Sequence, residues 1–95
     1  MTKYIVKETT AFKKSFKTAK KRGRDMKKLE KLLYILANGQ EIPLTYKDHQ
    51  LINSKRYINC RECNIEPDWL LIYQIINGDL ILLLVETGSH SDLFK

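Results

Sequence analysis

Apolar residues in the first third of the chain recur at every third or fourth position, which is the spacing of an amphipathic α-helix. One such segment starts at Thr9 or Thr10, either of which can cap it, and runs to about Lys21. A second starts at Asp25 and ends at the pair Asn38-Gly39. Their inward-facing residues are Phe12, Phe16 and Ala19 in the first and Met26, Leu29, Leu32, Leu33 and Leu36 in the second. With a tight join at Gly23, the pattern predicts a helical hairpin.

The rest of the pattern is typical of strands. A short strand at Tyr4, Ile5 and Val6 precedes the first helix, and residues 40–52 read as a polar loop. Later strands are predicted over Arg56–Cys60, Arg61–Ile65, Trp69–Ile76 and Leu80–Val85, the third of them central. Glu66-Pro67-Asp68 supplies one turn, and Asn77-Gly78-Asp79 predicts a hairpin turn of type I′.

This order of elements predicts an α+β fold, with an N-terminal strand, a basic helical hairpin on one face and a mainly antiparallel sheet. The 95 residues suit a single domain, 1–95, with one core. A composition with 43% hydrophobic and 29% charged residues is ordinary for a soluble protein. No apolar run reaches membrane-helix length, and the N-terminus lacks the apolar core of a signal peptide, so we expect a cytoplasmic location and no membrane partner.

The charge is distributed unevenly along the chain. Residues 1–31 hold twelve Lys or Arg and three acidic residues, whereas residues 32–95 hold five and eight. A solvated helix face is the ordinary interpretation, but this density favours an anionic partner such as nucleic acid. The basic residues expected to contact RNA or the ribosome are Lys13, Lys14, Lys17, Lys20, Lys21, Arg22 and Arg24.

Cys60 and Cys63 form a C-x-x-C pair in a region with strand character. A redox motif of this kind is expected at the start of a helix. A zinc site needs two further ligands, and the histidines at 49 and 90 lie far away in the sequence. We therefore interpret both cysteines as ordinary thiols and predict neither a metal nor a cofactor.

Three polar segments lie outside the core pattern, namely Lys47-Asp48-His49, Glu66-Pro67-Asp68-Trp69 and Gly88-Ser89-His90. If neighbouring strands bring the last two together, Asp68, Trp69 and His90 share one edge of the sheet, and the loop could bring His49 there. Imidazoles and a carboxylate beside a basic surface suit acid–base cleavage of RNA, without a required metal. Leu93 and Phe94 are expected to pack on the body and hold His90 in place.

Each of these residues also has an ordinary structural interpretation. A single histidine in a loop is usually solvated, and Asp68 after Pro67 is a common turn residue. Trp69 begins an apolar strand and is more often a core residue than a platform for a base.

Three motifs in order also resemble the YafQ branch of the RelE/ParE toxin superfamily. They are Tyr46-Lys47-Asp48-His49-x-Leu51, Arg61-Glu62-Cys63-x-Ile65-x-Pro67-Asp68-Trp69-Leu70-Leu71-Ile72-Tyr73 and Thr87-Gly88-Ser89-His90-Ser91-Asp92-Leu93-Phe94. The resemblance implies a small α+β fold like that of microbial RNases. It also implies a ribosome-dependent endoribonuclease that cuts mRNA, an mRNA interferase, and a cognate antitoxin that blocks it.

The resemblance further implies roles for individual residues. His90 would be a main acid–base group, with His49 and Asp68 assisting proton transfer or holding the substrate. Trp69 and Phe94 would shape the pocket or contact a base, as aromatic residues do in many RNA-binding proteins. The basic helices would bind ribosomal RNA.

Two positions depart from the family pattern. Asn64 stands where histidine is common, and an amide cannot shuttle a proton near neutral pH. Glu86 stands where many members have an arginine, which places a carboxylate near the expected phosphate. Arg61, Arg56 or Lys47 could substitute for that arginine as substrate-binding residues. The departures predict an activity that is weakened, altered in specificity or absent.

The sequence leaves three hypotheses. The first is an mRNA interferase of a type II toxin–antitoxin system, whose antitoxin would be acidic and fold on binding. The second is a non-catalytic relative that binds RNA, the ribosome or an antitoxin. The third is a ParE-like inhibitor of DNA gyrase.

Overall fold

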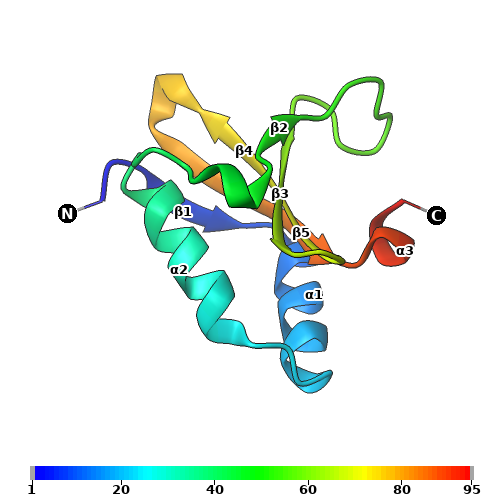
Figure 1. Cartoon of the computed structure of the whole chain (residues 1–95). Helices are drawn as coiled ribbons and strands as arrows, with labels where there is room; N and C mark the ends of the chain where they lie inside the picture. The colour runs from blue at the N-terminus through cyan, green and yellow to red at the C-terminus, as the bar shows by residue number, and fades with distance from the viewer. Residues whose placement is uncertain (1, 95) are drawn as a thin grey trace.

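The computed structural model describes residues 2–94 and has the expected α+β architecture (Figure 1). The strands are β1 Ile5–Glu8, β2 His49–Gln50, β3 Arg61–Glu66, β4 Trp69–Ile76 and β5 Ile81–Gly88. The α-helices are α1 Thr10–Lys21, α2 Met26–Ala37 and the short α3 His90–Leu93, and 3₁₀ turns lie at Leu44–Tyr46 and Asn77–Asp79. No helix of the described part of the chain has the length and apolar character needed to cross a membrane.

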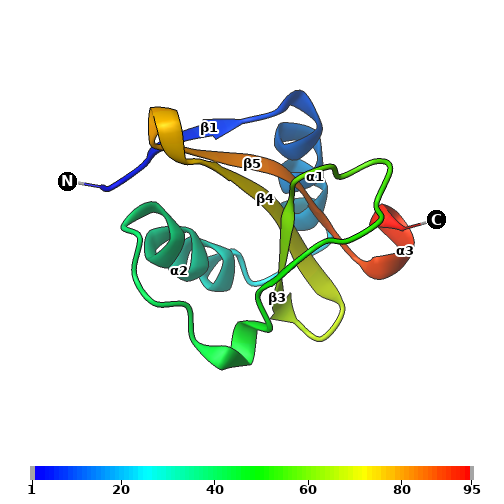
Figure 2. The same ribbon diagram turned by 90° about the horizontal axis from the view of Figure 1, so that it is seen from above.

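The five strands form one sheet in the order β1-β5-β4-β3-β2. β1 pairs with β5 in parallel, and every other pairing is antiparallel, as the sequence predicted for most of the sheet. β4 is the middle strand of the sheet (Figure 2). It is buried along most of its length. The last strand, β5, therefore lies between the first strand and the middle one.

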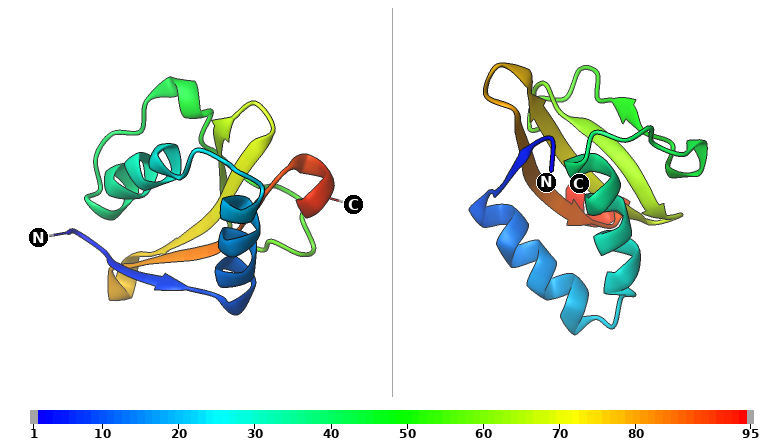
Figure 3. Two further views of the ribbon diagram at one scale, coloured as in Figure 1. Left: turned by 90° about the horizontal axis from the view of Figure 1, so that it is seen from below. Right: turned by 90° about the vertical axis from the view of Figure 1, so that its left-hand side faces the viewer.

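The helical hairpin is confirmed, together with its predicted caps. The Thr9 hydroxyl accepts a hydrogen bond from the Phe12 backbone N–H at 2.9 Å, and the Asp25 carboxylate accepts one from the Lys27 N–H at 3.2 Å. Gly23 follows α1 with a φ of +80°, a left-handed conformation that glycine adopts without strain. The two helices converge at this join and cover one face of the sheet (Figure 3).

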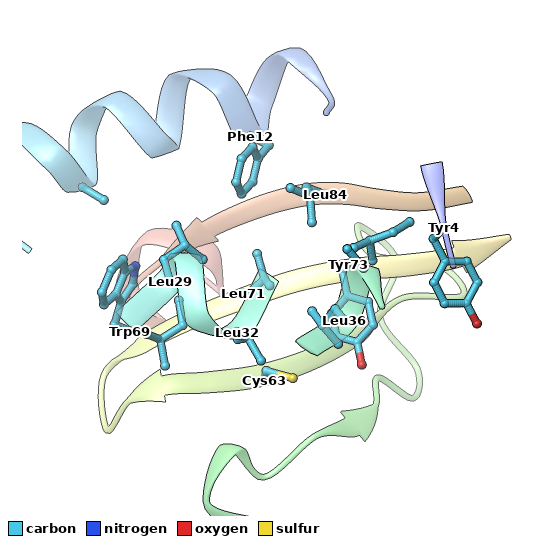
Figure 4. Close-up of a cluster of buried hydrophobic side chains, with 14 residues drawn as sticks. Tyr4, Phe12, Leu29, Leu32, Leu36, Cys63, Trp69, Leu71, Tyr73 and Leu84 are labelled. Atoms are coloured by element: carbon cyan, nitrogen blue, oxygen red, sulfur yellow. The ribbon is translucent and has the colours of Figure 1, made fainter. Parts of the chain in front are cut away.

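The main core lies between these helices and the sheet. Leu29 and Leu32 from α2 meet Leu71 of β4, with Phe12 of α1 above β5 (Figure 4). A smaller core lies on the opposite face, where the segment 51–60 and α3 cover β4. Its buried members are Tyr57, Cys60, Leu70, Ile72 and Leu93. Because β4 contributes to both cores, it ties the two layers together.

The strand predicted over Arg56–Cys60 is wrong, because this stretch belongs to a closed loop. The Leu51 N–H donates to the Cys60 carbonyl at 3.0 Å, and the Tyr57 N–H donates to the Ser54 hydroxyl at 3.0 Å. Asn59 has a φ of +60°, which no strand residue adopts. The strand before β3 is instead His49–Gln50, inside the segment predicted as a loop.

The turn between β4 and β5 also differs from the prediction. A hairpin is present, but Asn77–Asp79 form a 3₁₀ turn and the left-handed residue is Leu80, with a φ of +53°. The type I′ assignment is therefore wrong.

β5 extends beyond Val85, the predicted end of the strand, to Gly88. Its pairing with β4 is irregular, because Ile72 pairs with Glu86 and Tyr73 with Leu84, which leaves Val85 as an extra residue.

Leu71 offers a direct test of the main core. Leu71→Ala removes a fully buried side chain of the middle strand and should lower the free energy of unfolding by about 2–5 kcal/mol. Leu44→Ala is the matched control, because Leu44 is 94% exposed and its loss should change stability by less than about 0.5 kcal/mol. Urea unfolding followed by circular dichroism measures both. Equal effects would contradict the packing described.

Candidate active site

The pairing of β4 with β5 brings Asp68 and His90 together. Leu70 pairs with Gly88, so the turn residue just before β4 lies beside the residues just after β5. Asp68 Oδ1 accepts a hydrogen bond from the His90 backbone N–H at 2.9 Å and contacts the ring Nδ1 at 2.8 Å. The sequence predicted this juxtaposition, although the two residues are 22 positions apart.

The hydrogen bond defines the chemistry of the His90 ring. A carboxylate only accepts hydrogen bonds, so Nδ1 carries the proton that it donates to Asp68. In the neutral ring Nε2 then has the free lone pair, and the side chain is well exposed. The pKa of Asp68 lies below its usual value, first because the His90 backbone N–H bonds to the carboxylate and second because the ring does. Asp68 therefore stays ionised and holds the imidazole in place.

The short helix α3 anchors His90 from the other side. Ser89 and Asp92 form a reciprocal capping box, with bonds of 3.1 Å to the Ser89 hydroxyl and 3.0 Å to the Asp92 carboxylate. Leu93 is buried, as expected, while Phe94 is 41% exposed. The Phe94 ring centroid lies 5.7 Å from that of Tyr57 and 6.4 Å from that of His90. The terminal aromatic ring thus forms a partly exposed wall beside the histidine.

His49 occupies a different part of the molecule. It lies on β2, and β3 and β4 separate that strand from β5, so the two backbones are about 14 Å apart. Its Nδ1 contacts the Lys47 carbonyl at 2.7 Å, and its Nε2 lies 3.7 Å from Glu62 Oε2. A carbonyl also only accepts, so Nδ1 carries the proton here too. The structure does not place His49 beside the pair Asp68–His90.

One face of the sheet nevertheless carries most of the predicted site. Opposed residues of paired strands share a face. His49, Glu62, Ile72 and Glu86 form one row across the strands, and Asn64, Leu70 and Gly88 form the next. Leu93 of α3 packs on Leu70 and Ile72, so α3 covers this same face. Both positions that depart from the family pattern, Asn64 and Glu86, therefore belong to the face of His90.

Glu86 is not a free charge on this face. Its carboxylate accepts a hydrogen bond from the Tyr57 hydroxyl at 2.8 Å and two from Arg56 Nη2 at 2.9 and 3.1 Å. Burial, and then the bond to Glu86, raises the pKa of Tyr57, so the phenol keeps its proton. The repulsion expected between Glu86 and a phosphate is thereby reduced in the folded protein.

Arg61 lies on the opposite face and has another partner. Its guanidinium binds the Asp48 carboxylate at 2.7 Å, and Asp48 also accepts hydrogen bonds from Tyr73 and Cys63. Burial acts to raise the pKa of Asp48, but these bonds, with that of Arg61 first, outweigh it and the pKa is lowered. This cluster pins the loop before β2 to the sheet. The contact of Arg61 with substrate stays a prediction, and it would require the side chain to leave Asp48. Lys47 lies on the exposed loop beside His49.

Trp69 is a core residue. Its side chain is fully buried, and its Nε1–H donates to the Thr87 hydroxyl at 3.0 Å. That hydroxyl in turn donates to the Leu70 carbonyl at 2.6 Å, and the Arg24 guanidinium lies 5.3 Å from the indole centroid. No part of the ring is accessible, so Trp69 presents no face to a base in this structure, and its part in shaping the pocket stays a prediction. Its hydrogen bond instead fixes the start of β4 against β5.

The basic residues form a groove that reaches α3. A cavity of about 310 Å³ lies between α1 and the end of β5, and its lining includes Lys14, Arg22 and Arg24 together with the carboxylates of Glu86 and Asp92. Arg22 pairs with Asp92 at 3.0 Å, and Arg24 donates to the Asp68 carbonyl at 3.4 Å. The remaining predicted cations of α1 are exposed. Basic side chains therefore extend from the helix to the residues that hold His90.

The sequence reasoning missed Tyr57 as part of this region, and it named Arg56 and Asp48 without the partners that the fold gives them. Tyr57 and Arg56 were assigned to a strand, and no spacing in the sequence links them to Glu86, which lies about thirty residues later. The position of Asp48 next to His49 in the sequence marked it as a candidate polar residue, but only the fold shows that it pairs with Arg61. Residues 2–94 contain no group of three or more His, Cys, Asp or Glu able to hold a metal ion, and Cys60 and Cys63 are buried free thiols.

The fold and the site together define a small α+β toxin domain of the class that the sequence resembles. The family model for YafQ, bacterial toxins of type II toxin–antitoxin systems, matches residues 4–95. The chain belongs to this family.

Known relatives are similar along most of the chain. The mRNA interferase toxin YafQ of Escherichia coli strain B / BL21-DE3 is 44% identical over 87% of this chain and 87% of its own length. YafQ in a crystal structure of the E. coli DinJ–YafQ toxin–antitoxin complex has a TM-score of 0.87 at 35% identity, covering 98% of this chain and 99% of that one. A metal-bound toxin from Helicobacter pylori has a TM-score of 0.88 at 40% identity, covering 96% and 99%.

The Asp48 cluster predicts a specific dependence of stability on pH. The pKa of Asp48 is lower in the folded protein than in the unfolded chain, so the carboxylate stabilises the fold above about pH 4 and this contribution is lost as the pH falls through the folded pKa. Asp48→Asn should cost about 1–3 kcal/mol at neutral pH and flatten the loss of stability between about pH 5 and pH 2.

Asp79→Asn serves as the control, since Asp79 is exposed and its side chain makes no hydrogen bond or ion pair within residues 2–94. Chemical unfolding at a series of pH values provides the comparison. If both variants kept the acid dependence of the parent protein, the role of Asp48 would be refuted.

Proposed function

We propose that this protein is the toxin of a type II toxin–antitoxin system and acts as a ribosome-dependent mRNA endoribonuclease. Its relatives in E. coli are named mRNA interferase toxins. The observation that carries the proposal is the pair Asp68–His90, which leaves an exposed imidazole available for proton transfer near a groove lined in part by basic residues. Acting on ribosome-bound mRNA, the protein would work in the cytoplasm.

The chemistry requires two proton transfers and no change of oxidation state. The 2′-hydroxyl loses its proton to a base, its oxygen forms a bond to phosphorus, and the bond from phosphorus to the 5′-oxygen breaks. The leaving 5′-oxygen keeps the electron pair and takes a proton, which gives a 2′,3′-cyclic phosphate and a 5′-hydroxyl. Nε2 of His90 takes part in one of these two proton transfers, and a water molecule takes part in the other. Asp68 orients the ring.

His49 has a separate role in this proposal. It contacts the Lys47 carbonyl and Glu62 rather than Asp68 or His90, on a strand three spacings, or about 14 Å, from β5. It lies on the same face of the sheet, with Asn64 in the next row between the two. We assign His49 to holding the RNA further along the strand rather than to the proton transfer at His90. Phe94, partly exposed beside His90, offers a ring for a base.

The basic residues of α1 and the following join would bind phosphate groups of mRNA or ribosomal RNA. The groove lined by Lys14, Arg22 and Arg24 leads to the residues that hold His90, so it suits the strand entering the site. The outward residues, Lys13, Lys17, Lys20 and Lys21, suit the surrounding ribosomal RNA.

A cognate antitoxin is the proposed protein partner. DinJ binds YafQ in the E. coli complex. Here the formal net charge of +6, concentrated in residues 1–31, suits an acidic segment that folds as it binds. Such a segment would cover the cations that otherwise attract RNA, which is a direct way to block the toxin.

His90 provides the principal test. His90→Ala should reduce cleavage of a translated mRNA by purified ribosomes about 10²–10⁴-fold, because a positioned acid–base group is lost. Asp68→Asn should also reduce it, since an amide can no longer hold the ring as an ionised carboxylate does. His49→Ala should affect the rate constant at saturation far less than His90→Ala. Ser91→Ala, at the neighbouring exposed position, is the control and should cleave as the parent does. Full activity of His90→Ala would refute the proposal.

Salt dependence tests the proposed contact of α1 with RNA. Affinity for ribosomes should fall steeply as salt rises. Lys17→Ala and Lys21→Ala should each weaken binding and reduce the slope of log affinity against log salt by about one per lost phosphate contact. Lys31→Ala removes an exposed cation of α2 and should leave the slope unchanged. A slope that drops equally in all three variants would show that only net charge matters.

A further inference from the structure

Cleavage of RNA places extra negative charge on the oxygens of the reacting phosphate, so the site needs a cation that can reach it. Several arginines lie near the site, but most are committed to the fold. Arg61 is on the other face with Asp48, Arg22 pairs with Asp92, and Arg24 covers Trp69. Arg56 differs from these residues, because it lies on the same face as His90 and its side chain is 56% exposed.

The donors of Arg56 are largely unused. Both of its bonds to Glu86 come from one nitrogen, Nη2. Within residues 2–94 neither Nη1 nor Nε of Arg56 makes a hydrogen bond, so three of the five N–H donors remain for a ligand. Once Nη2 is released from Glu86, the planar fork of the guanidinium is well suited to bind two phosphate oxygens at once. The bond to Glu86 thus occupies the side chain without saturating it.

Glu86 keeps a partner even when Arg56 moves. The Tyr57 hydroxyl bonds to the same carboxylate at 2.8 Å, and the carboxylate is only 16% exposed. Tyr57 is buried, so this bond does not depend on the exposed arginine. The cost of separating Arg56 from Glu86 is therefore modest, since an ion pair with one exposed member contributes little.

The aromatic rings of Tyr57 and Phe94 form a continuous wall between Arg56 and His90. The guanidinium carbon lies 5.2 Å from the Tyr57 ring centroid, Tyr57 packs edge-on against Phe94, and Phe94 lies beside His90. RNA lying along this wall would place one phosphate near the imidazole and present the same stretch of backbone to the arginine.

We propose that Arg56 is the phosphate-binding residue of this site, and that Glu86 is its counter-ion while RNA is absent. On binding, the guanidinium turns from Glu86 to the non-bridging oxygens of the RNA phosphate, and Glu86 stays bonded to Tyr57. The guanidinium then stabilises the charge that grows as the 2′-oxygen bonds to phosphorus and the 5′-oxygen leaves. This inference rests on the proposed endoribonuclease function.

The test compares Arg56→Ala with Lys55→Ala, which removes the neighbouring exposed cation of the same loop. Single-turnover cleavage of a translated mRNA is measured with saturating ribosomes, so that binding and chemistry are separated. We expect Arg56→Ala to slow cleavage about 100-fold and Lys55→Ala to cleave as the parent does. Arg56→Lys should be intermediate, because an ammonium keeps the charge and loses the fork. Thermal unfolding confirms that each variant is folded.

Glu86→Gln separates the proposal from a purely structural ion pair. An amide can still accept the Tyr57 hydrogen bond but no longer holds Arg56 by charge, so cleavage should be at least as fast as in the parent. Cleavage as slow as in Arg56→Ala would show that the pair itself is needed, and would overturn the proposal. Equal rates for Arg56→Ala and the parent would overturn it as well.

The failure of the underlying function gives a different result. If the parent protein and His90→Ala were equally inert on ribosomes carrying mRNA, the endoribonuclease proposal would fail. If the parent cleaves, His90→Ala does not, and Arg56→Ala is unimpaired, only the role of Arg56 is refuted.

Discussion

The pairing of β4 with β5 is the interaction on which the rest of the structure depends. β4 contributes side chains to both cores. Its register with β5 places the turn before β4, with Asp68, beside the end of β5, with His90. The bonds from Trp69 to Thr87 and from Thr87 to the Leu70 carbonyl fix that register at the site end of the strands. A slip by one residue would reverse the faces of β5 and separate Asp68 from His90. Core packing and site geometry are therefore consequences of the same contact.

The two faces of the sheet carry different groups of residues. Basic helices and the main core occupy one face, while the imidazoles, Asn64 and the pair Arg56–Glu86 occupy the other. The groove beside α1 joins the two at the end of β5, where Arg22 and Arg24 contact residues that hold His90. Glu86 belongs to both regions, because it lines this groove and also pairs with Arg56 on the face of His90.

Local signals in the sequence were sufficient for α1 and α2, for β3 and β4 and for the meeting of Asp68 with His90, but not for the short helix α3. Thr9, Asp25 and Gly23 mark helix ends through their own backbone chemistry, and the turn at Pro67 requires adjacent strands. The sequence could not reveal the loop 51–60, because Tyr57, Ile58 and Cys60 give it the apolar content of a strand, whereas Tyr57 and Cys60 pack on the middle strand β4. Nor could it show that β3 and β4 separate His49 from β5, since the lateral order of strands depends on packing over the whole chain.

The position of β5 in the sheet has a consequence for how the protein is made. The parallel pairing of Ile5 with Ile81 joins residues far apart in sequence, and the strand that closes the sheet is the last of the five to be synthesised. A nascent chain that lacks β5 leaves β1 without a neighbour and β4 with one open edge, and it has no His90. Long-range pairing of this kind delays folding until both partners are present. The active site therefore forms only after β5 has been synthesised, so the protein cannot act on RNA while its own chain is still incomplete.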